Sequence, residues 1–286
     1  MPKNHSAPGQ GDHAQSQNDY TEAVSHGLLL PLALVCLLMT LNGVRPVAES
    51  RSSPFFMSLR DVGLFLKGAH TDNLIRRLSD RDGPRAAFEQ LYADLDDPWR
   101  SEDPRYRYQN QKYRRIAAAL PKGRHFARAL DIGCGLGGLS RAIALHADEV
   151  LGLDIAQEAV DRATHLARGV RNLSFDRGDI LNLPRSLDGK FDLVIAADSL
   201  YYLPSPIEDA VLKSVALRFA DLLAPGGLCV LANHYFFRGH PESPMTRRIH
   251  KAFQWSSGLR MVSSCWHPFY LVAVLERNLS ETVCIP

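Results

Sequence analysis

The chain has 286 residues, of which 45% are hydrophobic and 22% are charged, and its formal net charge is +2. These values are typical of a globular protein with a sizeable core, either one α/β domain with extensions or two small domains. The near-neutral charge disfavours an extended nucleic-acid surface, so a nucleic-acid partner is not expected. The five cysteines form no C-x-x-C pair and no Cys/His cluster of zinc spacing, which indicates reduced thiols, a cytoplasmic protein and no metal site.

Residues 1–60 are expected to form an extension and linker outside the folded domain. Residues 1–26 are rich in Gln, Asn, Ser, His and Gly and are predicted to be disordered. The apolar run LLLPLALVCLLMTL at 28–41 is shorter than the roughly 20 residues of a spanning helix, and it contains Pro31. Three interpretations of this run stay open: a loosely packed extension, a segment that contacts a membrane surface, and a secretion signal, although the basic start of a signal peptide is missing.

Residues 61–125 are expected to form a helical cap ahead of the main domain. Two apolar stripes at helical spacing lie on either side of Gly83-Pro84. Their members are Leu74, Ile75 and Leu78, followed by Phe88, Leu91, Tyr92 and Leu95. A further helix is expected to end before Pro121. The basic run around it is expected to be a solvated face, with attraction of an anionic acceptor as the alternative. This run consists of Arg100, Arg105, Arg107, Lys112, Arg114 and Arg115.

Strands and helices alternate over residues 126–277, which are expected to form the main domain, with residues 278–286 as a tail. Strands are predicted at 127–132, 149–153, 172–176, 191–196 and 228–234, and helices at 137–146, 156–167 and 206–223. Such alternation favours a parallel sheet with helices on both faces. After a helix at 244–255, strands at 259–266 and 269–277 are separated only by His267-Pro268, a connection that permits a hairpin and not a crossover. The last strand is therefore predicted to be antiparallel.

The stretch DIGCGLGGL at 131–139 carries the strongest chemical signal. Gly133, Gly135 and Gly138 satisfy the G-x-G-x-x-G pattern of nicotinamide and flavin sites. Gly133, Gly135 and Gly137, preceded by Asp131, equally satisfy the looser loop of S-adenosylmethionine enzymes. Asp154 follows about 20 residues later, at the end of the second strand, where a carboxylate can accept the hydroxyls of a ribose. Both cofactor types use these features, so the loop and Asp154 leave the choice open.

Three further features favour a sulfonium cofactor. Asp131 lies at the carboxyl end of the first strand, where a carboxylate repels a pyrophosphate and attracts the ammonium and sulfonium groups of S-adenosylmethionine. Asp179, within RGDI at 177–180, is placed after the third strand to accept the adenine amino group. The closing antiparallel hairpin is not part of the usual dinucleotide fold.

Five stretches together resemble the class I S-adenosylmethionine-dependent methyltransferases over residues 85–277. They are DIGCGLGGL, LGLD, RGDI, FDLVIAADSLYYL and LLAPGGLCVLANH. The resemblance implies a Rossmann-like seven-stranded sheet of order 3-2-1-4-5-7-6, with the cofactor at the carboxyl edge of strands 1, 2 and 4. Within that superfamily, DDPWRSEDPRYRYQNQKY and LYYL are most similar to the nodulation protein S group, which N-methylates an amino sugar of chitin-derived oligosaccharides. The long N-terminal extension departs from that group.

We therefore expect a set of cofactor contacts drawn from the strand ends and from the segment before the core. The set is Asp131, Gly133, Gly135, Gly137, Asp154, Ile155, Asp179, Ile180 and Asp198, with Trp99 and Tyr113 from the preceding segment. Aromatic side chains at Trp99, Tyr106, Tyr108 and Tyr113 are suited to stack on adenine or on a sugar face, and for two or three of these four the expected role is helix packing. The free amides of Gly137 and Gly138 are expected at a helix N-terminus.

The acceptor side depends on Asp198 and His234, which follow the fourth and end the fifth strand and so share one sheet edge. We expect one to act as the base and the other as the residue that orients it, in either assignment. The alternative is that Asp198 caps a helix and His234 is an ordinary strand-end residue. Residues 234–250 are expected to form a lid, with His250 at the surface. The sequence A-D-S-L replaces the N-P-P-Y signature, which disfavours adenine-N6 and glutamine substrates.

The sequence thus predicts a methyltransferase that uses S-adenosylmethionine on an amine or hydroxyl of a small molecule, sugar-like or a specialised metabolite. RNA or protein methylation is one alternative, and a non-catalytic S-adenosylmethionine-binding protein is another. A monomer and a homodimer both stay open.

Overall fold

The structure is a computed structural model that describes residues 59–235, 243–256, 258–267 and 269–278. The predictions for the extension at 1–58, which includes the apolar run at 28–41, lie outside the described residues. The same holds for the middle of the expected lid, 236–242, and for the tail from 279 onward. Residues from Phe55 onward belong to one compact unit, so the helical region and the sheet described below are parts of one body.

Within the described residues 59–125, where a helical cap is expected, three helices precede the sheet. They are α3 (Leu59–Asp82), α4 (Pro84–Asp94) and α5 (Arg107–Ala118). Gly83, with φ 82°, separates the first two, and Pro84 occupies the first turn of α4, where its missing N–H costs no hydrogen bond. The apolar stripe of α4 is buried, with Phe88 and Leu91 inside.

The sheet has seven strands in the order β3-β2-β1-β4-β5-β7-β6, as predicted. The strands are β1 (Phe126–Ile132), β2 (Ala147–Asp154), β3 (Leu173–Arg177), β4 (Phe191–Ala197), β5 (Leu223–His234), β6 (Leu259–His267) and β7 (Tyr270–Arg277). Strands β1 to β5 pair in parallel, whereas β7 pairs antiparallel with both β5 and β6. The short connection at 268 thus makes the predicted hairpin, and the last strand is antiparallel.

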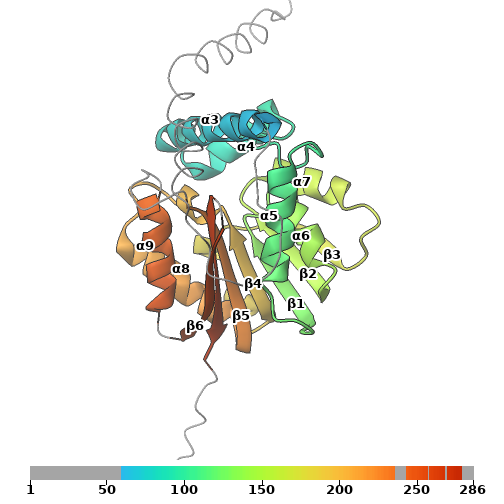
Figure 1. Cartoon of the computed structure of the whole chain (residues 1–286). Helices are drawn as coiled ribbons and strands as arrows, with labels where there is room; N and C mark the ends of the chain where they lie inside the picture. The colour runs from blue at the N-terminus through green and yellow to red at the C-terminus, as the bar shows by residue number, and fades with distance from the viewer. Residues whose placement is uncertain (1–58, 236–242, 257, 268, 279–286) are drawn as a thin grey trace, which may run out of the picture. The chain divides into compact units, whose positions relative to one another are not determined.

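Helices cover both faces of the sheet (Figure 1). α6 (Gly138–Ile143) and α7 (Gln157–Leu166) pack on β1 to β3, and α8 (Asp209–Leu222) and α9 (Ser243–Gln254) pack on β4 to β6. The chain moves outward from β1 in one direction and from β4 in the other, so right-handed crossovers place these helix pairs on opposite faces. β3 and β4 are connected through two 3-10 turns, η1 (Ile180–Asn182) and η2 (Arg185–Leu187), in agreement with the irregular connection expected there.

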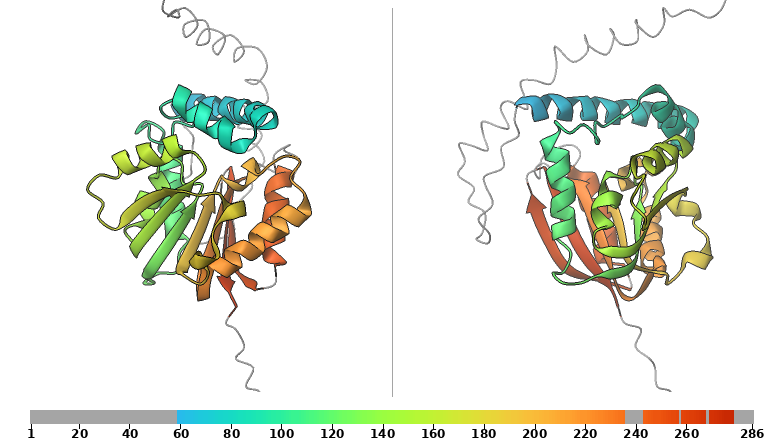
Figure 2. Two further views of the ribbon diagram at one scale, coloured as in Figure 1. Left: turned by 180° about the vertical axis from the view of Figure 1, so that it is seen from behind. Right: turned by 90° about the vertical axis from the view of Figure 1, so that its right-hand side faces the viewer.

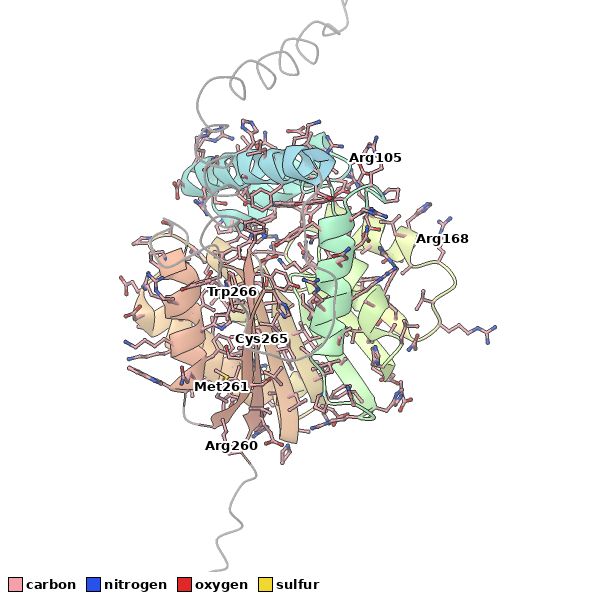
Figure 3. All side chains as sticks on the ribbon, in the orientation of Figure 1. Arg105, Arg168, Arg260, Met261, Cys265 and Trp266 are labelled. Carbon is pink, nitrogen blue, oxygen red and sulfur yellow. The ribbon has the colours of Figure 1, made fainter. Side chains whose placement is uncertain are left out.

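Two elements differ in length from the predictions. β5 begins at Leu223 rather than 228, because Leu223 pairs with Phe191 before a register shift lets the chain pass through a Pro-Gly-Gly turn. α6 has six residues rather than ten, because β2 begins as early as Ala147. At the other side of the sheet, β6 is the edge strand, and Cys265 and Trp266 lie exposed along it (Figure 3).

Helices α3 and α4 of the cap lie across the carboxyl ends of the parallel strands, and α5 runs alongside the sheet next to α6 (Figure 2). A cluster of apolar side chains joins Ile75 of α3 and Leu91 of α4 to Leu136 of the glycine loop and Ala156 after β2. A separate, larger cluster fills the space between the sheet and α8 and α9. The cap therefore covers the edge where the predicted site residues project. Of the helices in the described ranges, none combines the length and apolar character that a membrane crossing requires.

Candidate active site

The glycine loop is tied to the end of β2 by Asp154. The backbone N–H of Gly135 donates to Asp154 Oδ2 at 2.9 Å, and the N–H of Ala156 donates to Oδ1 at 3.1 Å. The side chain is 7% exposed, and burial raises the pKa of its carboxyl. Each oxygen accepts one hydrogen bond and retains further lone-pair capacity, so the carboxylate is held rigidly while it can still accept from a ligand.

At two positions of the loop only glycine fits, because the backbone has a positive φ and neighbouring side chains leave no room for a Cβ. Gly133 has φ 71°, and a Cβ placed there would lie 2.3 Å from the Cβ of Ser199. Gly137 has φ 75°, and a Cβ there would lie 2.5 Å from the ring of Phe175. One expectation for the loop is wrong: the N–H of Gly137 is not free, because it donates to the carbonyl of Cys134 at 2.9 Å as the loop closes into a turn.

Asp131 lies at the end of β1 with 2% exposure. Ser140 Oγ donates to its Oδ2 at 2.6 Å. Burial raises the pKa of Asp131 to about 6, and the Ser140 hydrogen bond opposes that rise. Burial disfavours the ionised form of this carboxyl, so any cation that binds beside it stabilises that form.

A second carboxylate approaches the same loop from the cap. One oxygen of Glu102 pairs with Arg141, while its Oε1 is buried and no hydrogen-bond donor among the described residues reaches it. A Cβ placed on Gly138 would lie 3.0 Å from this Oε1 and 2.7 Å from the edge of the Tyr113 ring. A buried acceptor without a donor fits an incoming ammonium group. The loop, Asp131 and Glu102 thus fit the cationic amino-acid end of S-adenosylmethionine.

The remaining predicted cofactor residues lie along the same edge. Asp179 accepts hydrogen bonds from Leu181 N at 2.9 Å and Asn182 Nδ2 at 2.7 Å, and so starts the turn η1. Ile155 and Ile180 are half-buried and pack against the two apolar clusters. These positions follow β2 and β3, where the adenosine part of the cofactor was expected, and their contacts with it stay a prediction.

The aromatic residues before the core divide into packed and site-facing members. Tyr106 and Tyr108 are buried at 5% and 1% exposure, so they serve packing. Trp99 is half-buried, stacks on Phe88 with ring centroids 5.9 Å apart, and donates from Nε1 to Asp72 Oδ1 at 2.7 Å. Tyr113 lies against the loop at Gly138, and its hydroxyl accepts from Gln109 at 2.9 Å. Tyr113 is therefore the best placed of the four to contact a ligand.

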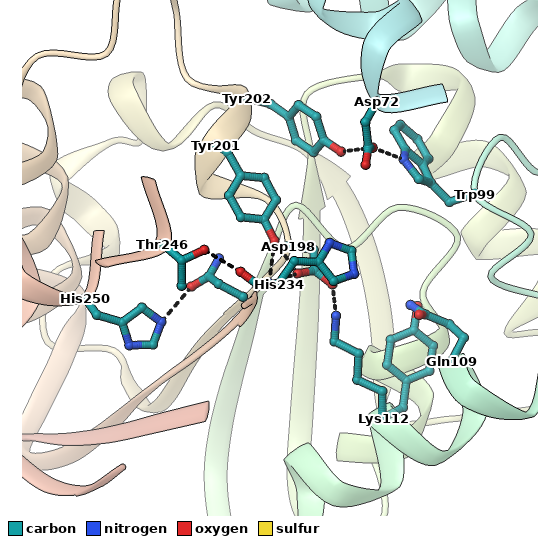
Figure 4. A network of polar contacts seen from close by, with 12 residues as sticks. Asp72, Trp99, Gln109, Lys112, Asp198, Tyr201, Tyr202, His234, Thr246 and His250 are labelled. Carbon is teal, nitrogen blue, oxygen red and sulfur yellow. Dashed lines mark hydrogen bonds and ion pairs between the residues drawn. The ribbon is translucent and has the colours of Figure 1, made fainter. Parts of the chain in front are cut away.

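On the acceptor side, the structure brings Asp198 and His234 together (Figure 4). Asp198 follows β4 with φ 53°, an uncommon conformation for a residue with a side chain. Its Oδ1 accepts from the N–H of His234 at 3.0 Å and from the hydroxyl of Tyr201, which lies in the 3-10 turn η3 (Leu200–Tyr202). Strained backbone of this kind persists where the surroundings over-determine it, often at functional sites.

Lys112 completes this cluster, although its position in a basic run did not single it out in the sequence. Its Nζ forms an ion pair with Asp198 Oδ2, and the side chain is 1% exposed. The expectation of a solvated basic face is therefore wrong at this position. Lys112 lies four residues from Tyr108 and from Ile116, and all three are the buried residues of α5. That spacing, which places one lysine in an apolar stripe, was the signal available in the sequence. Burial lowers the pKa of Lys112 to about 7.

His234 sits at the end of β5 with its imidazole partly screened by rings. The imidazole is parallel to the ring of Tyr201, with centroids 6.4 Å apart, and Phe65 of α3 meets it edge-on. Its Nε2 lies 3.7 Å from Asp198 Oδ2. Burial lowers the pKa of His234 well below its usual value, and the charge of Lys112 lowers it further. The ring is therefore neutral at pH 7 and can accept a proton.

His250 is not a surface residue, contrary to expectation. It lies on α9 and is 8% exposed, and its Nε2 lies 3.1 Å from Asn233 Oδ1 on β5. Burial lowers its pKa to about 4. Nearby, Thr246 Oγ1 donates to the carbonyl of His234 at 2.5 Å. Both contacts fix α9 against the end of β5, because the helix's polar side chains face the strand here rather than solvent.

A second carboxylate links the cap to the acceptor side. Asp72 Oδ1 on α3 accepts from Tyr202 OH at 2.6 Å in addition to Trp99. Tyr202 follows β4 in the same turn as Tyr201. The cap is thus joined to the end of β4 by two carboxylate-centred contacts, one at Asp72 and one at Asp198.

This sheet order, with a glycine loop and carboxylates at the carboxyl edge, defines a Rossmann-like fold of the methyltransferase type. Residues 126–271, just over half of the chain, match the model of a methyltransferase domain family. The chain belongs to this methyltransferase domain family. The predicted resemblance to class I methyltransferases is confirmed, and since that class takes its methyl group from S-adenosylmethionine, so is the predicted cofactor.

Similar proteins include both N- and O-methyltransferases. Nodulation protein S of Rhizobium tropici is 29% identical over 138 residues, which cover 48% of this chain and 55% of the relative. Ubiquinone biosynthesis O-methyltransferase of Psychrobacter arcticus is 31% identical over 139 residues, which cover 47% of this chain and 50% of the relative. The chain therefore spans about half the length of these curated relatives.

One solved structure has a similar fold over a larger share of the chain. It is the N-methyltransferase NodS from Bradyrhizobium japonicum WM9 in complex with S-adenosyl-L-homocysteine. Its TM-score is 0.51 at 21% identity, and the alignment covers 72% of this chain and 98% of that chain. At this identity the likeness establishes the fold, and the acceptor has to be inferred from this chain's own residues.

Proposed function

We propose that the protein transfers a methyl group from S-adenosylmethionine to an amine or hydroxyl of a small molecule, sugar-like or a specialised metabolite. The observation that carries this proposal is the position of two residue groups on one sheet edge. The glycine loop with Asp131 and Asp154 lies at the ends of β1 and β2, and Asp198 with His234 lies at the ends of β4 and β5. A methyl donor and a proton acceptor can therefore be brought together there.

Binding of the cofactor is assigned to the first group. When bound, S-adenosylmethionine supplies an activated methyl group on a sulfonium. Asp154 would accept the ribose hydroxyls and Asp179 the adenine amino group, while Asp131 and Glu102 would face the cationic amino-acid end. Asp131 would gain most from this contact, because a neighbouring cation favours the ionised form that burial disfavours.

Proton removal from the acceptor is assigned to His234, with Asp198 as the residue that orients it. Asp198 is a poor base, because both of its oxygens are already engaged by Lys112, Tyr201 and the N–H of His234. The neutral imidazole of His234 has the capacity to take a proton. Of the two assignments left open by the sequence, the geometry supports this one.

The charge of the cluster supports an uncharged acceptor. Its charges are balanced within the protein by the Lys112–Asp198 pair, so it favours an uncharged nucleophile over a phosphate or a carboxylate. Similarity to nodulation protein S supports an amino-sugar acceptor, and similarity to the ubiquinone enzymes supports a hydroxyl. We place the enzyme in the cytoplasm, which the scattered cysteines support.

Isothermal titration calorimetry of the full chain with S-adenosylmethionine, S-adenosylhomocysteine and NADH tests the first step. We expect binding of the first two and none of NADH; the reverse result would refute the cofactor assignment. Asp154→Ala should lose affinity at least tenfold, whereas Asp176→Ala, an exposed carboxylate on the neighbouring strand, should not. Amino sugars, glycosides and phenols are then screened by release of S-adenosylhomocysteine. Turnover only with RNA or protein, or binding without any turnover, would support the two alternatives instead.

A further inference from the structure

Lys112 occupies a place in the acceptor cluster that methyl transfer does not by itself explain. It comes from α5 of the cap, and its Nζ lies 5.4 Å from the centre of the Tyr270 ring on β7. An ammonium group taken this far out of water is costly unless a carboxylate compensates it. Asp198 Oδ2 provides that compensation. The cap thus places an ammonium group, charged at pH values below its lowered pKa of about 7, beside the predicted base.

The ion pair, together with two hydrogen bonds, occupies both oxygens of Asp198, so neither is left for the imidazole. Oδ1 is bound by the N–H of His234 and by Tyr201, and Oδ2 is bound by Lys112. The His234 Nε2 lies 3.7 Å from Oδ2, which is beyond hydrogen-bond distance. Without the lysine, Oδ2 would be a buried and uncompensated carboxylate oxygen next to the ring, and a protonated imidazole would be its natural partner.

Among the described residues, the other side chains named here around His234 supply no such charge. Tyr201 from η3 and Tyr270 from β7 are neutral phenols, because burial raises the pKa of both. From α3, the ring of Phe65 meets the imidazole, and from α9 the hydroxyl of Thr246 binds the backbone carbonyl. Asp72 of α3 is the remaining carboxylate of the network, and its oxygen is shared by Trp99 and Tyr202.

We propose that Lys112 is a positioning residue of the acceptor site: its ion pair withholds Asp198 from His234 and keeps the imidazole uncharged, ready to take the acceptor's proton. This role rests on the methyl-transfer function proposed above. In that step a lone pair of the acceptor forms the bond to the methyl carbon. The electron pair of the carbon–sulfur bond passes to sulfur, and the acceptor's proton passes to a ring nitrogen of His234.

The test is an NMR titration of the His234 imidazole in the full chain, which needs no acceptor. The resonance is assigned by its loss in His234→Gln. In the wild type we expect the ring to stay uncharged to well below pH 6.5. In Lys112→Met we expect an upward shift of about 1 to 3 pH units, because a carboxylate within roughly 4–6 Å then favours the charged ring. Lys112→Arg keeps the charge, and Lys122→Met removes an exposed lysine, so neither should show this shift.

An unchanged His234 titration in folded Lys112→Met would overturn the proposal. If Lys112→Met does not fold, two other variants are titrated, Asp198→Asn and Lys112→Met/Asp198→Asn. The double variant replaces both charges and therefore leaves no buried ion unpaired. Both are expected to keep the ring uncharged to below pH 6.5, and an upward shift in either would show that Asp198 is not the group that Lys112 withholds.

The outcome is separable from that of the proposed function. The titration needs neither cofactor nor acceptor, whereas the proposed function is tested by binding of S-adenosylmethionine to the wild type. If the wild type failed to bind the cofactor, the proposed function would fall whatever the titration showed. With an acceptor in hand, the rising limb of the pH profile of kcat/KM should move upward in Lys112→Met by the same 1 to 3 units, with Lys112→Arg restoring its position.

Discussion

Replacing the buried Asp131 by asparagine should stabilise the protein as the pH rises while it weakens cofactor binding. Folding raises the pKa of Asp131 from 3.8 to about 6. Below the unfolded value both states hold the proton, and between the two values only the folded state does. The wild type therefore loses stability as the pH rises through this interval and keeps the loss above it.

The magnitude follows from the size of the shift. About two pKa units at about 1.4 kcal/mol each give about 3 kcal/mol. Asparagine keeps the acceptor for Ser140 and has no charge, so its stability lacks this dependence. The new amide N–H₂ adds an offset that does not change with pH. The difference in unfolding free energy, Asp131→Asn minus wild type, should thus rise by about 3 kcal/mol in all between about pH 3 and pH 7 and then level off.

The assay is urea unfolding of the full chain at several pH values, followed by circular dichroism. Asp176→Asn, on the exposed part of β3, is the matched control and should give a flat difference. Calorimetry at pH 7.5 should show at least tenfold weaker binding of S-adenosylmethionine to Asp131→Asn, about 1.4 kcal/mol. A flat difference curve for Asp131→Asn, or one that falls with pH, would refute the reasoning about its buried charge.

Three further changes test the packing around the site. Gly133→Ala should lower the free energy of unfolding in urea by about 2–5 kcal/mol, because the backbone is left-handed and the new Cβ would lie 2.3 Å from Ser199. Gly123→Ala is the control, since Gly123 also has a positive φ but open space around it, and it should cost only about 1–2 kcal/mol. Equal losses for the two variants would contradict the overlap at Gly133. His250 is buried uncharged and its pKa is lowered from 6.5 to about 4, so stability falls as the pH drops through that interval, by up to about 3 kcal/mol, and His250→Gln should remove this dependence. Trp99→Phe removes the indole N–H that donates to Asp72 Oδ1 and should lower the free energy of unfolding by about 1–2 kcal/mol in thermal unfolding; an unchanged stability would contradict the importance of this hydrogen bond.

The order of the strands was predicted from the resemblance to class I methyltransferases and not from local patterns. Local patterns predicted the alternation of strands and helices, whose crossovers have one hand. The two-residue gap at His267 allowed only a hairpin, which fixed the antiparallel direction of β7. Gly133 and Gly137 were visible as glycines, since a tight turn after a strand needs positive φ. The prediction placed the start of β5 after the Pro-Gly-Gly turn, because such a turn usually ends a strand. In the structure Leu223, before the turn, already pairs with β4, and the pairing continues from Leu228.

The candidate site was recovered in part, at the strand ends. Asp131, Asp154, Asp198 and His234 follow strands in the sequence, and parallel strands present their carboxyl ends at one edge. Which of the two acceptor-side residues is engaged, and by what, did not follow from position along the chain. The hydrogen bonds that saturate Asp198 come from three different elements.

Sequence by itself determined the alternating strands and helices, the closing hairpin and the glycine loop, because each depends on residue type and spacing within a short stretch; the sheet order and the family followed from the resemblance of several such stretches to known methyltransferases. Only the tertiary structure decided the burial and the partners of Lys112, His250 and Glu102. A lysine within a basic run and a histidine in a polar helix look solvated until the facing element is known. Burial depends on which side of a helix meets the strand ends, and burial sets both the partner and the protonation state of each of these side chains.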